Sequence, residues 1–432
     1  MNKLLLTTLL ATAALSGCLN DDGDTAGGDA LAAPAHGVPS FEDVLPASVT
    51  GIELLGQLTG DDGATANGAG IWPYGDYVFG AGLGGGFWIA DISDPSAPQM
   101  LFQTPEDTET AFSRDADIID HGDGRLTLVL ATQSDGMHLW DVTDPAQPIF
   151  ASRLLADVAN HNVAVVPGTH YVFNSQSGGS GTTNDLVDAS DPYEPVIVGT
   201  YGDYGCHDIS YFGTKGGDKF RAYCAGIEVT EIWDLDRFDP AASGFGISVL
   251  GSVDFGESPL ESPVVGNPLL ATYPLRTLHH LAIVNNDASV LIIGDEHNGG
   301  GAPGMCLVYD PVTGLSTPLG ALWFYDITDE ANPTLLSWIS PPTEVDPVGA
   351  AGAADPTQAL PNCTAHFGTI VPGEDKLVMA WYTAGILVID FSDPSAPVIL
   401  DQVKAGGNVW DARIHHGYVF SGDIVRGLDA YK

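Results

Sequence analysis

One short sequence motif occurs six times along this chain, and a shortened seventh copy follows at Gly427–Lys432. Each copy is an apolar segment that ends in Asp and runs into a turn rich in Asp and Pro. The full copies lie at Gly86–Pro98, Gly136–Pro148, Asp185–Pro195, Glu231–Pro240, Ala321–Pro333 and Gly385–Pro397, and the short copy at Gly427–Lys432. Self-similarity at this period indicates a repeat architecture.

The apolar segment of each copy is expected to be the third of four strands in its unit. Two apolar segments precede it, as in His161–Val166 and His170–Asn174, and one follows it, as in Val196–Thr200. Short strands separated by Gly and Pro turns predict antiparallel sheets, and no long segment has the apolar period of a helix. Four-stranded units in tandem are typical of a β-propeller, so the sequence predicts an all-β, seven-bladed propeller over residues 49–432.

An Asp is expected to end each third strand, at near-constant spacing. We expect its carboxylate to accept hydrogen bonds from amides of the following turn, which is a structural role. The spacing is interrupted only in the fifth unit, which carries two Gly- and Pro-rich insertions at about 257–275 and 297–320. The residues concerned are Asp91, Asp141, Asp188, Asp234, Asp326, Asp390 and Asp429.

The seventh unit has no fourth strand after it, whereas a spare strand, Thr50–Leu58, precedes the first unit. We expect this strand to pair beside Gly427–Tyr431 and to complete the last blade. Such pairing closes the ring and removes an exposed sheet edge. The alternative, an open solenoid, would need capping repeats, and none is evident.

The N-terminal residues predict export. Lys3 and the apolar run Leu4–Leu15 read as a signal peptide over residues 1–17, too short for a stable membrane span. Cys18 after Leu-Ser-Gly resembles the bacterial lipoprotein processing site, which implies lipidation of Cys18. An ordinary signal peptide is the alternative. Residues 18–48 read as a lipidated Cys and a flexible acidic tether. We therefore expect a lipid-anchored protein of the outer membrane or cell surface.

The chain is strongly acidic, with a formal net charge of −42 from 14 Lys+Arg against 56 Asp+Glu. This composition argues against nucleic acid as a partner, because nucleic-acid binding needs basic surface. It also argues against adhesion of the propeller itself to anionic lipid, so the lipid anchor is the expected membrane contact. A well-solvated surface in salty water, or cation binding, would suit the acidic excess.

Four cysteines remain once Cys18 is assigned to lipid, and in an exported chain they allow disulfides with three connectivities. Cys206 and Cys224 lie on consecutive strands joined by the turn Gly213–Asp218, and hairpin pairing brings them together. This favours Cys206–Cys224 and, by elimination, Cys306–Cys363.

Ile386–Pro394 (Ile-Leu-Val-Ile-Asp-Phe-Ser-Asp-Pro) resembles the LVIVD repeat of bacterial and archaeal surface proteins. Gly205–Asp208 with Arg221–Cys224, and His280 followed by Gly294–Glu296, look like the choice-of-anchor B family of such proteins. The likeness covers most of residues 50–432. It implies a propeller and surface display but no particular reaction. The insertion after Glu296 and the lipid anchor depart from the family pattern.

Four histidines are expected to open the first strands of blades 3 to 6: His161, His207, His280 and His366. First strands line a propeller's channel, so these side chains are predicted to converge at one mouth. Imidazoles and carboxylates there could bind a divalent transition metal, and the weaker candidate ligands Asp117 and Asp411 are expected nearby. His279 and the pair Asp295–Glu296 could add a ligand or a general base. A structural role, with each His bonding backbone, is the alternative.

These features lead to three functional hypotheses. The first is a surface binding module that takes a small molecule, glycan or protein at the channel mouth or at the insertions. The second is a metal-dependent hydrolase or oxidase that uses the four histidines, with Glu296 or Asp295 as the catalytic candidate. The third is a lectin that stacks a sugar on Trp72, Trp381 or Trp410. No nucleophile elbow, phosphate loop or His-Glu-x-x-His motif is present.

Overall fold

The computed structural model describes residues 49–58, 68–83, 85–104, 113–133, 135–154, 160–175, 179–180, 182–254, 278–296, 306–310, 315–318, 320–341, 363–404 and 406–432. The predicted signal peptide, Cys18 and the predicted tether therefore lie outside the described residues. The described part is built from strands and turns, and it contains no helix long and apolar enough to span a membrane.

The strands of the described residues form seven four-stranded antiparallel sheets, which confirms the predicted seven-bladed β-propeller. In order from first to fourth strand, blades 1 to 3 are β2 (Gly68–Tyr74), β3 (Tyr77–Gly82), β4 (Phe87–Asp91) and β5 (Gln99–Gln103); β6 (Ser113–Asp120), β7 (Leu126–Thr132), β8 (Gly136–Asp141) and β9 (Ile149–Leu154); and β10 (Asn162–Val165), β11 (Tyr171–Ser175), β13 (Asn184–Asp188) and β14 (Val196–Tyr201).

Blades 4 to 7 follow the same order. They are β16 (Asp208–Phe212), β17 (Arg221–Gly226), β18 (Val229–Asp234) and β19 (Ser248–Asp254); β20 (His279–Val284), β21 (Val290–Asp295), β24 (Leu322–Asp326) and β25 (Thr334–Ile339); β26 (Gly368–Ile370), β27 (Lys376–Ala380), β28 (Ile386–Asp390) and β29 (Val398–Val403); and β30 (Val409–His415), β31 (Tyr418–Asp423), β32 (Gly427–Tyr431) and β1 (Leu54–Leu58).

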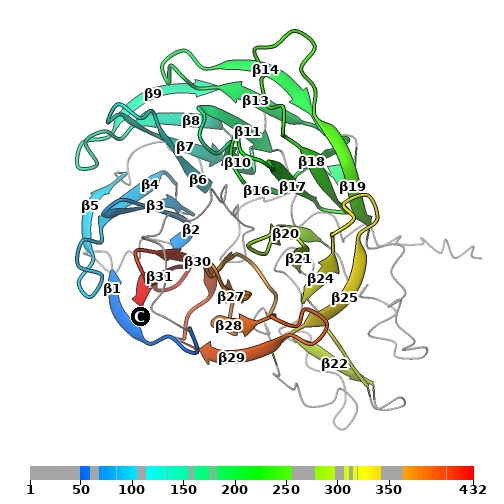
Figure 1. Cartoon of the computed structure of the whole chain (residues 1–432). Coiled ribbons are helices and arrows are strands. Elements are labelled where there is room, and N and C mark those ends of the chain that lie inside the picture. Colours follow the sequence, from blue (N-terminus) through cyan, green and yellow to red (C-terminus); the bar gives the residue numbers. More distant parts are fainter. Residues whose placement is uncertain are drawn as a thin grey trace, which may run out of the picture.

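The blades stand around a central axis with their first strands innermost and their fourth strands at the rim (Figure 1). The second and third strands are almost wholly buried, because each blade face packs on the next blade. Phe87 of blade 1, for example, meets Trp140 of blade 2 with ring centroids 5.0 Å apart. Aromatic residues of the third strands therefore pack between neighbouring blades at this interface.

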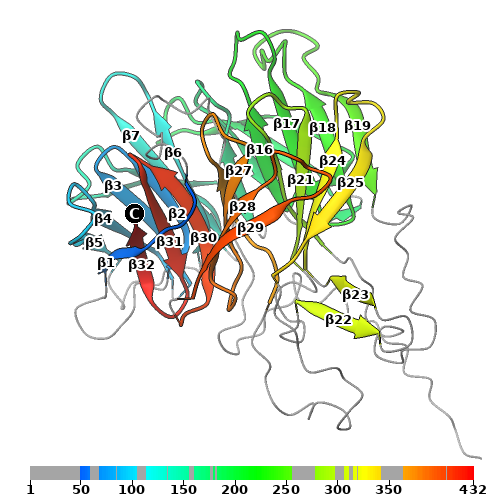
Figure 2. The same ribbon diagram turned by 60° about the horizontal axis from the view of Figure 1, so that its bottom comes forward.

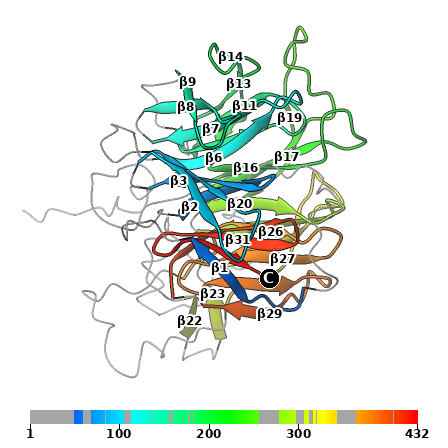
Figure 3. The same cartoon turned by 90° about the vertical axis from the view of Figure 1, so that its left-hand side faces the viewer.

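The N-terminal strand β1 closes the ring as predicted. It pairs antiparallel with β32, with Leu58 opposite Leu428 and Leu54 opposite Tyr431 (Figure 2). In this pairing Leu55 is skipped, just as Val198 is skipped between β13 and β14 in blade 3. The strand therefore reproduces the β-bulge of a fourth strand. The residues just before β1 reach blade 6, where the Ile52 amide donates to Asp401 Oδ2 at 3.1 Å, and Figure 3 shows β1 beside β29.

The turn role predicted for the repeated Asp residues is confirmed in six blades. In each, a carboxylate oxygen accepts a hydrogen bond from the amide two residues later, at 2.8 to 3.0 Å; the acceptors are Asp91, Asp141, Asp188, Asp234, Asp326 and Asp390. The prediction is wrong for Asp429. Gly136 and Gly427 both open a third strand with positive φ, and counting on from them aligns Asp141 with Lys432. Asp429 is instead buried within β32, where it pairs with Arg426.

Two further two-stranded sheets occur in the described part of the chain. β12 (Gly179–Ser180) pairs with β15 (Tyr204–Gly205), and β22 (Leu307–Asp310) pairs with β23 (Leu315–Pro318). The second hairpin belongs to the insertion predicted at 297–320, and it projects below the ring in Figure 2. The insertion predicted at 257–275 lies outside the described residues.

Candidate functional site

The four histidines predicted to share a register form one buried row of rings in contact, where four consecutive blades begin their first strands. Their ring centroids are 4.5 Å apart between His161 and His207, 4.2 Å between His207 and His280, and 4.2 Å between His280 and His366. Each comes from a different blade, from blade 3 to blade 6. The predicted convergence is therefore present, and consecutive blades supply consecutive rings.

Backbone pairing with the second strand holds these residues where their chains approach the channel. The amide of His207 donates to Ala225 O at 2.5 Å, that of His161 to Ser175 O at 2.9 Å, and that of His366 to Ala380 O at 3.1 Å. These bonds continue the ladder beyond the formal start of β10, β16 and β26. The histidine register is thus a consequence of strand pairing.

Three side chains bring candidate metal ligands together: His207, His280 and Glu296. One nitrogen or oxygen atom of each lies within 4.8 Å of the other two, and all three residues are fully buried. His280 Nε2 is 3.6 Å from Glu296 Oε2. His207 ends the segment before β16, whereas His280 lies on β20 and Glu296 directly follows β21, so the group joins blades 4 and 5.

Glu296 is held by contacts on both its backbone and its side chain. Its amide donates to Leu278 O at 3.2 Å. Tyr382 donates its hydroxyl to Glu296 Oε1 at 2.5 Å from blade 6. Tyr382 has a φ of 37°, in the left-handed region that a bulky residue rarely adopts. Such backbone strain concentrates at functional sites. Tyr382 was not predicted from the sequence, where no motif marks it.

His366 completes the arrangement from blade 6. Its Nδ1 is 2.6 Å from the Trp410 carbonyl oxygen, and its Nε2 is 3.6 Å from Glu296 Oε1. Trp410 stands in blade 7 one residue before Asp411, the register at which His207 precedes Asp208. Its ring lies 4.7 Å from that of His366. Aligning the repeats would have placed Trp410 next to the histidines.

Burial keeps the imidazoles neutral. It lowers the pKa of His207 to about 3, and it lowers the pKa of His280 and of His366 well below the usual value. Within the part of the chain that the structure describes, neither ring nitrogen of His207 has a hydrogen-bond partner, nor does Nε2 of His280 or His366. Buried polar atoms without partners are costly, and neutral imidazole is the metal-binding form.

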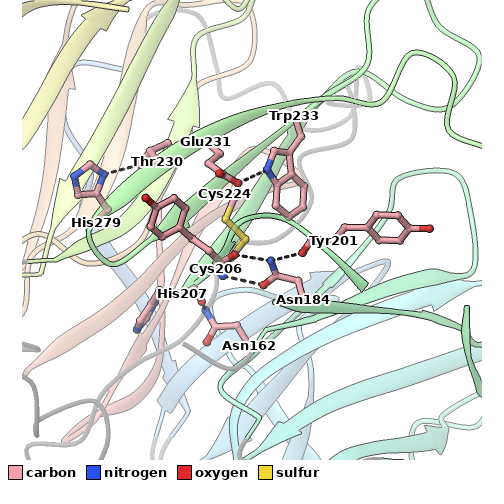
Figure 4. The surroundings of a disulfide bond; sticks show 11 residues. Asn162, Asn184, Tyr201, Cys206, His207, Cys224, Thr230, Glu231, Trp233 and His279 are labelled. Carbon is pink, nitrogen blue, oxygen red and sulfur yellow. Dashed lines mark hydrogen bonds between the residues drawn. A yellow bond between two sulfur atoms is a disulfide. The ribbon is translucent and has the colours of Figure 1, made fainter. Parts of the chain in front are cut away.

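The other predicted site residues lie elsewhere. His279 turns to Thr230, whose hydroxyl is 2.7 Å from its Nδ1 (Figure 4). Asp295 accepts a hydrogen bond from the Leu278 amide at 3.0 Å. It therefore braces the chain before β20, and it is not part of the three-residue group.

The acidic candidates Asp117 and Asp411 do not share the histidine register. Asp411 pairs opposite Gly422, one residue beyond that register, and the equivalent residue in blade 2 is Asp115. Asp117 lies two residues further along β6. Its carboxylate accepts from the Val165 amide of blade 3 at 2.7 Å, whereas Asp411 accepts from Ile71 of blade 1 at 3.2 Å. Both carboxylates therefore tie neighbouring first strands together.

Asp117 should impose a pH dependence on stability. Burial raises its pKa from 3.8 to about 7, so the folded state holds this proton more tightly than the unfolded state. Its contribution is fully present below pH 3.8 and is lost as the pH rises to about 7, by of order 4 kcal/mol. His207 acts in the opposite sense, because its lowered pKa removes stability as the pH falls below 6.5.

Comparing Asp117→Asn with the wild type separates these two contributions. In urea unfolding across this pH range, the free energy of unfolding of the variant should increase relative to that of the wild type as the pH rises. A constant difference between the two proteins would contradict a raised pKa for Asp117.

The described residues form two disulfides, Cys206–Cys224 and Cys306–Cys363, as predicted. Cys206 directly precedes His207, and its amide donates to Asn184 Oδ1 at 2.8 Å (Figure 4). The Asn162 side chain donates to the His207 carbonyl oxygen. Cys363 lies three residues before His366. Both cross-links therefore anchor segments that carry site histidines.

The tryptophans considered for sugar stacking differ in exposure. Trp381 and Trp410 are fully buried, whereas Trp72 is partly exposed. Trp410 lies against His366 and Tyr382, so its ring belongs to the wall of the histidine site.

Comparison with known families identifies LVIVD repeats at residues 67–104 and 379–404. The first segment covers all four strands of blade 1, from β2 through β5, and the second runs from the end of β27 through β29. No curated protein matches the chain.

Proposed function

We propose that this LVIVD-repeat propeller is a binding protein that holds a divalent transition-metal ion between blades 4 and 5, on His207, His280 and Glu296. Two imidazole nitrogens and a carboxylate oxygen are a donor set that suits Zn²⁺ and its neighbours in the first transition row. The observation that carries the proposal is the burial of these three groups with their ligand atoms within 4.8 Å of one another.

Burial also favours a resident ion over a catalytic one. Catalytic metal sites keep a position open to water or substrate, whereas the three side chains here have no exposed surface. For the same reason the hydrolase or oxidase hypothesis receives less support. The lectin hypothesis is weakened as well, since Trp381 and Trp410 are buried.

Metal analysis of the purified protein tests the proposal. We expect about one ion per chain to survive dialysis in the wild type, and the double substitution His207→Ala with His280→Ala to lose it. His161→Ala is the matched control, because His161 shares the register but is not one of the three ligands. A folded wild type that stays metal-free after exposure to Zn²⁺, Co²⁺, Ni²⁺ and Cu²⁺ would refute metal binding.

We further propose that the protein is exported, lipid-anchored at Cys18 and displayed at the outer membrane or cell surface. Display at the surface is what its resemblance to the choice-of-anchor B family implies, whereas the lipid anchor is specific to this chain. The sequence Leu15–Cys18 after an apolar run supports this. We expect Cys18→Ser to move the protein from the membrane fraction to the soluble fraction. Retention of that variant in membranes would count against the anchor.

A further inference from the structure

We infer that His366 supplies a fourth ligand through Nε2, so that the ion is enclosed by three imidazoles and one carboxylate and links blades 4, 5 and 6. This inference rests on the proposed function. It assigns the site to the closed, four-coordinate class typical of structural Zn²⁺, with no position left for water. The ion would then act as a cross-link between blades.

The hydrogen bond to Trp410 determines which nitrogen of His366 carries the proton. A backbone carbonyl can only accept, so the 2.6 Å contact requires Nδ1 to be the N–H donor. In the neutral ring, Nε2 is then an acceptor whose lone pair is free to bind a cation, although the ring itself is buried. A bond from the distal nitrogen to a backbone carbonyl is also the usual way in which proteins orient a metal-binding histidine.

The lone pair of His366 Nε2 faces a second acceptor. Glu296 Oε1 lies 3.6 Å away, and Glu296 Oε2 lies at the same distance from His280 Nε2. The lone pair of His366 Nε2 and an ionised Glu296 carboxylate repel each other across such a gap unless a cation lies between them. One ion bound by Glu296 and both imidazoles removes that repulsion.

The surrounding contacts match those of a metal site. The Tyr382 hydroxyl fixes the Glu296 carboxylate, as the Trp410 carbonyl fixes His366. The rings of His207, His280 and His366 already lie in consecutive contact, with centroids 4.2 Å apart at both steps. Binding would draw the ligand atoms to about 3.3 Å from one another, the separation set by Zn–N bonds of about 2.0 Å in a tetrahedron.

Cobalt spectroscopy on the full chain tests the inference. With Co²⁺ bound, we expect the intense visible bands of a four-coordinate ion in the wild type. His366→Ala should weaken these bands and lower Co²⁺ affinity about tenfold or more. His366→Cys should add a thiolate-to-cobalt charge-transfer band in the near ultraviolet, whereas His161→Cys should not. That band appears only when residue 366 touches the ion, so a merely structural role would not produce it.

The outcomes separate this inference from the proposed function. A wild type that binds no metal refutes both. A wild type that binds Co²⁺, with the spectrum and affinity unchanged in His366→Ala and no charge-transfer band in His366→Cys, refutes His366 as a ligand and leaves the three-residue site intact. Should His366→Ala fail to fold, His366→Gln, which keeps much of the side-chain volume, replaces it for the affinity measurement.

Discussion

Leu58→Asp is expected to destabilise the propeller by at least about 4 kcal/mol. Leu58 lies on the closing strand β1 with 5% of its surface exposed, in a cluster that contains Leu428 of blade 7 and Ile71, Val78 and Trp88 of blade 1. An Asp there would bury an unpaired carboxylate at the junction where the ring closes. Thermal unfolding followed by circular dichroism measures the loss.

Leu54→Asp on the same strand is the matched control. Leu54 is 47% exposed, so the same substitution should change stability by no more than about 0.5 kcal/mol. Equal losses in the two variants would mean that β1 responds to charge in general. Equal tolerance would mean that the strand does not close the ring in solution.

We expect loss of the Cys306–Cys363 disulfide to lower stability more, and loss of the Cys206–Cys224 disulfide to lower metal affinity more. The bridged cysteines are 18 residues apart in Cys206–Cys224 and 57 apart in Cys306–Cys363. Loop-closure entropy then predicts losses of about 3 and about 4 kcal/mol in the Cys→Ser pair variants. Denaturant unfolding should therefore show the larger loss for Cys306→Ser with Cys363→Ser.

Metal affinity should show the reverse order. Cys206 is bonded to the ligand His207 through the backbone, whereas two residues separate Cys363 from His366. We expect Cys206→Ser with Cys224→Ser to weaken Zn²⁺ binding more, as measured by competition with a chelator. If one variant shows the larger loss in both measurements, the disulfide acts on the metal site only through overall stability.

The repeat could be read from the sequence because its signals are local. Third strands, Asp turns and the spare strand Thr50–Leu58 each depend on a few adjacent residues and on the period of the repeat. The same locality explains the error at Asp429. Asp429 matches the repeated Asp by residue type, but counting from Gly427 places Asp429 within β32, where no turn follows directly.

The candidate site was predictable only in part. The common register of His207, His280 and His366 follows from strand pairing, which the repeat reveals. Asp117 was misplaced by three residues relative to the histidine register, because the alternation of a strand shows which face a side chain takes and not which residue of a neighbouring blade it meets. Tyr382 was missed because its contact with Glu296 spans 86 residues.

The sequence by itself determined the all-β blades, their number and order, the closure of the ring by β1, the two disulfide pairs and the set of histidines that share one register. Only the tertiary structure decided which histidines meet Glu296, that Tyr382 and Trp410 orient the site, and that Asp117 and Asp411 bond backbone amides. The physical reason is that pairing within a blade is encoded by neighbouring residues. Contacts between neighbouring blades depend instead on how the folded ring brings side chains that are distant in sequence together.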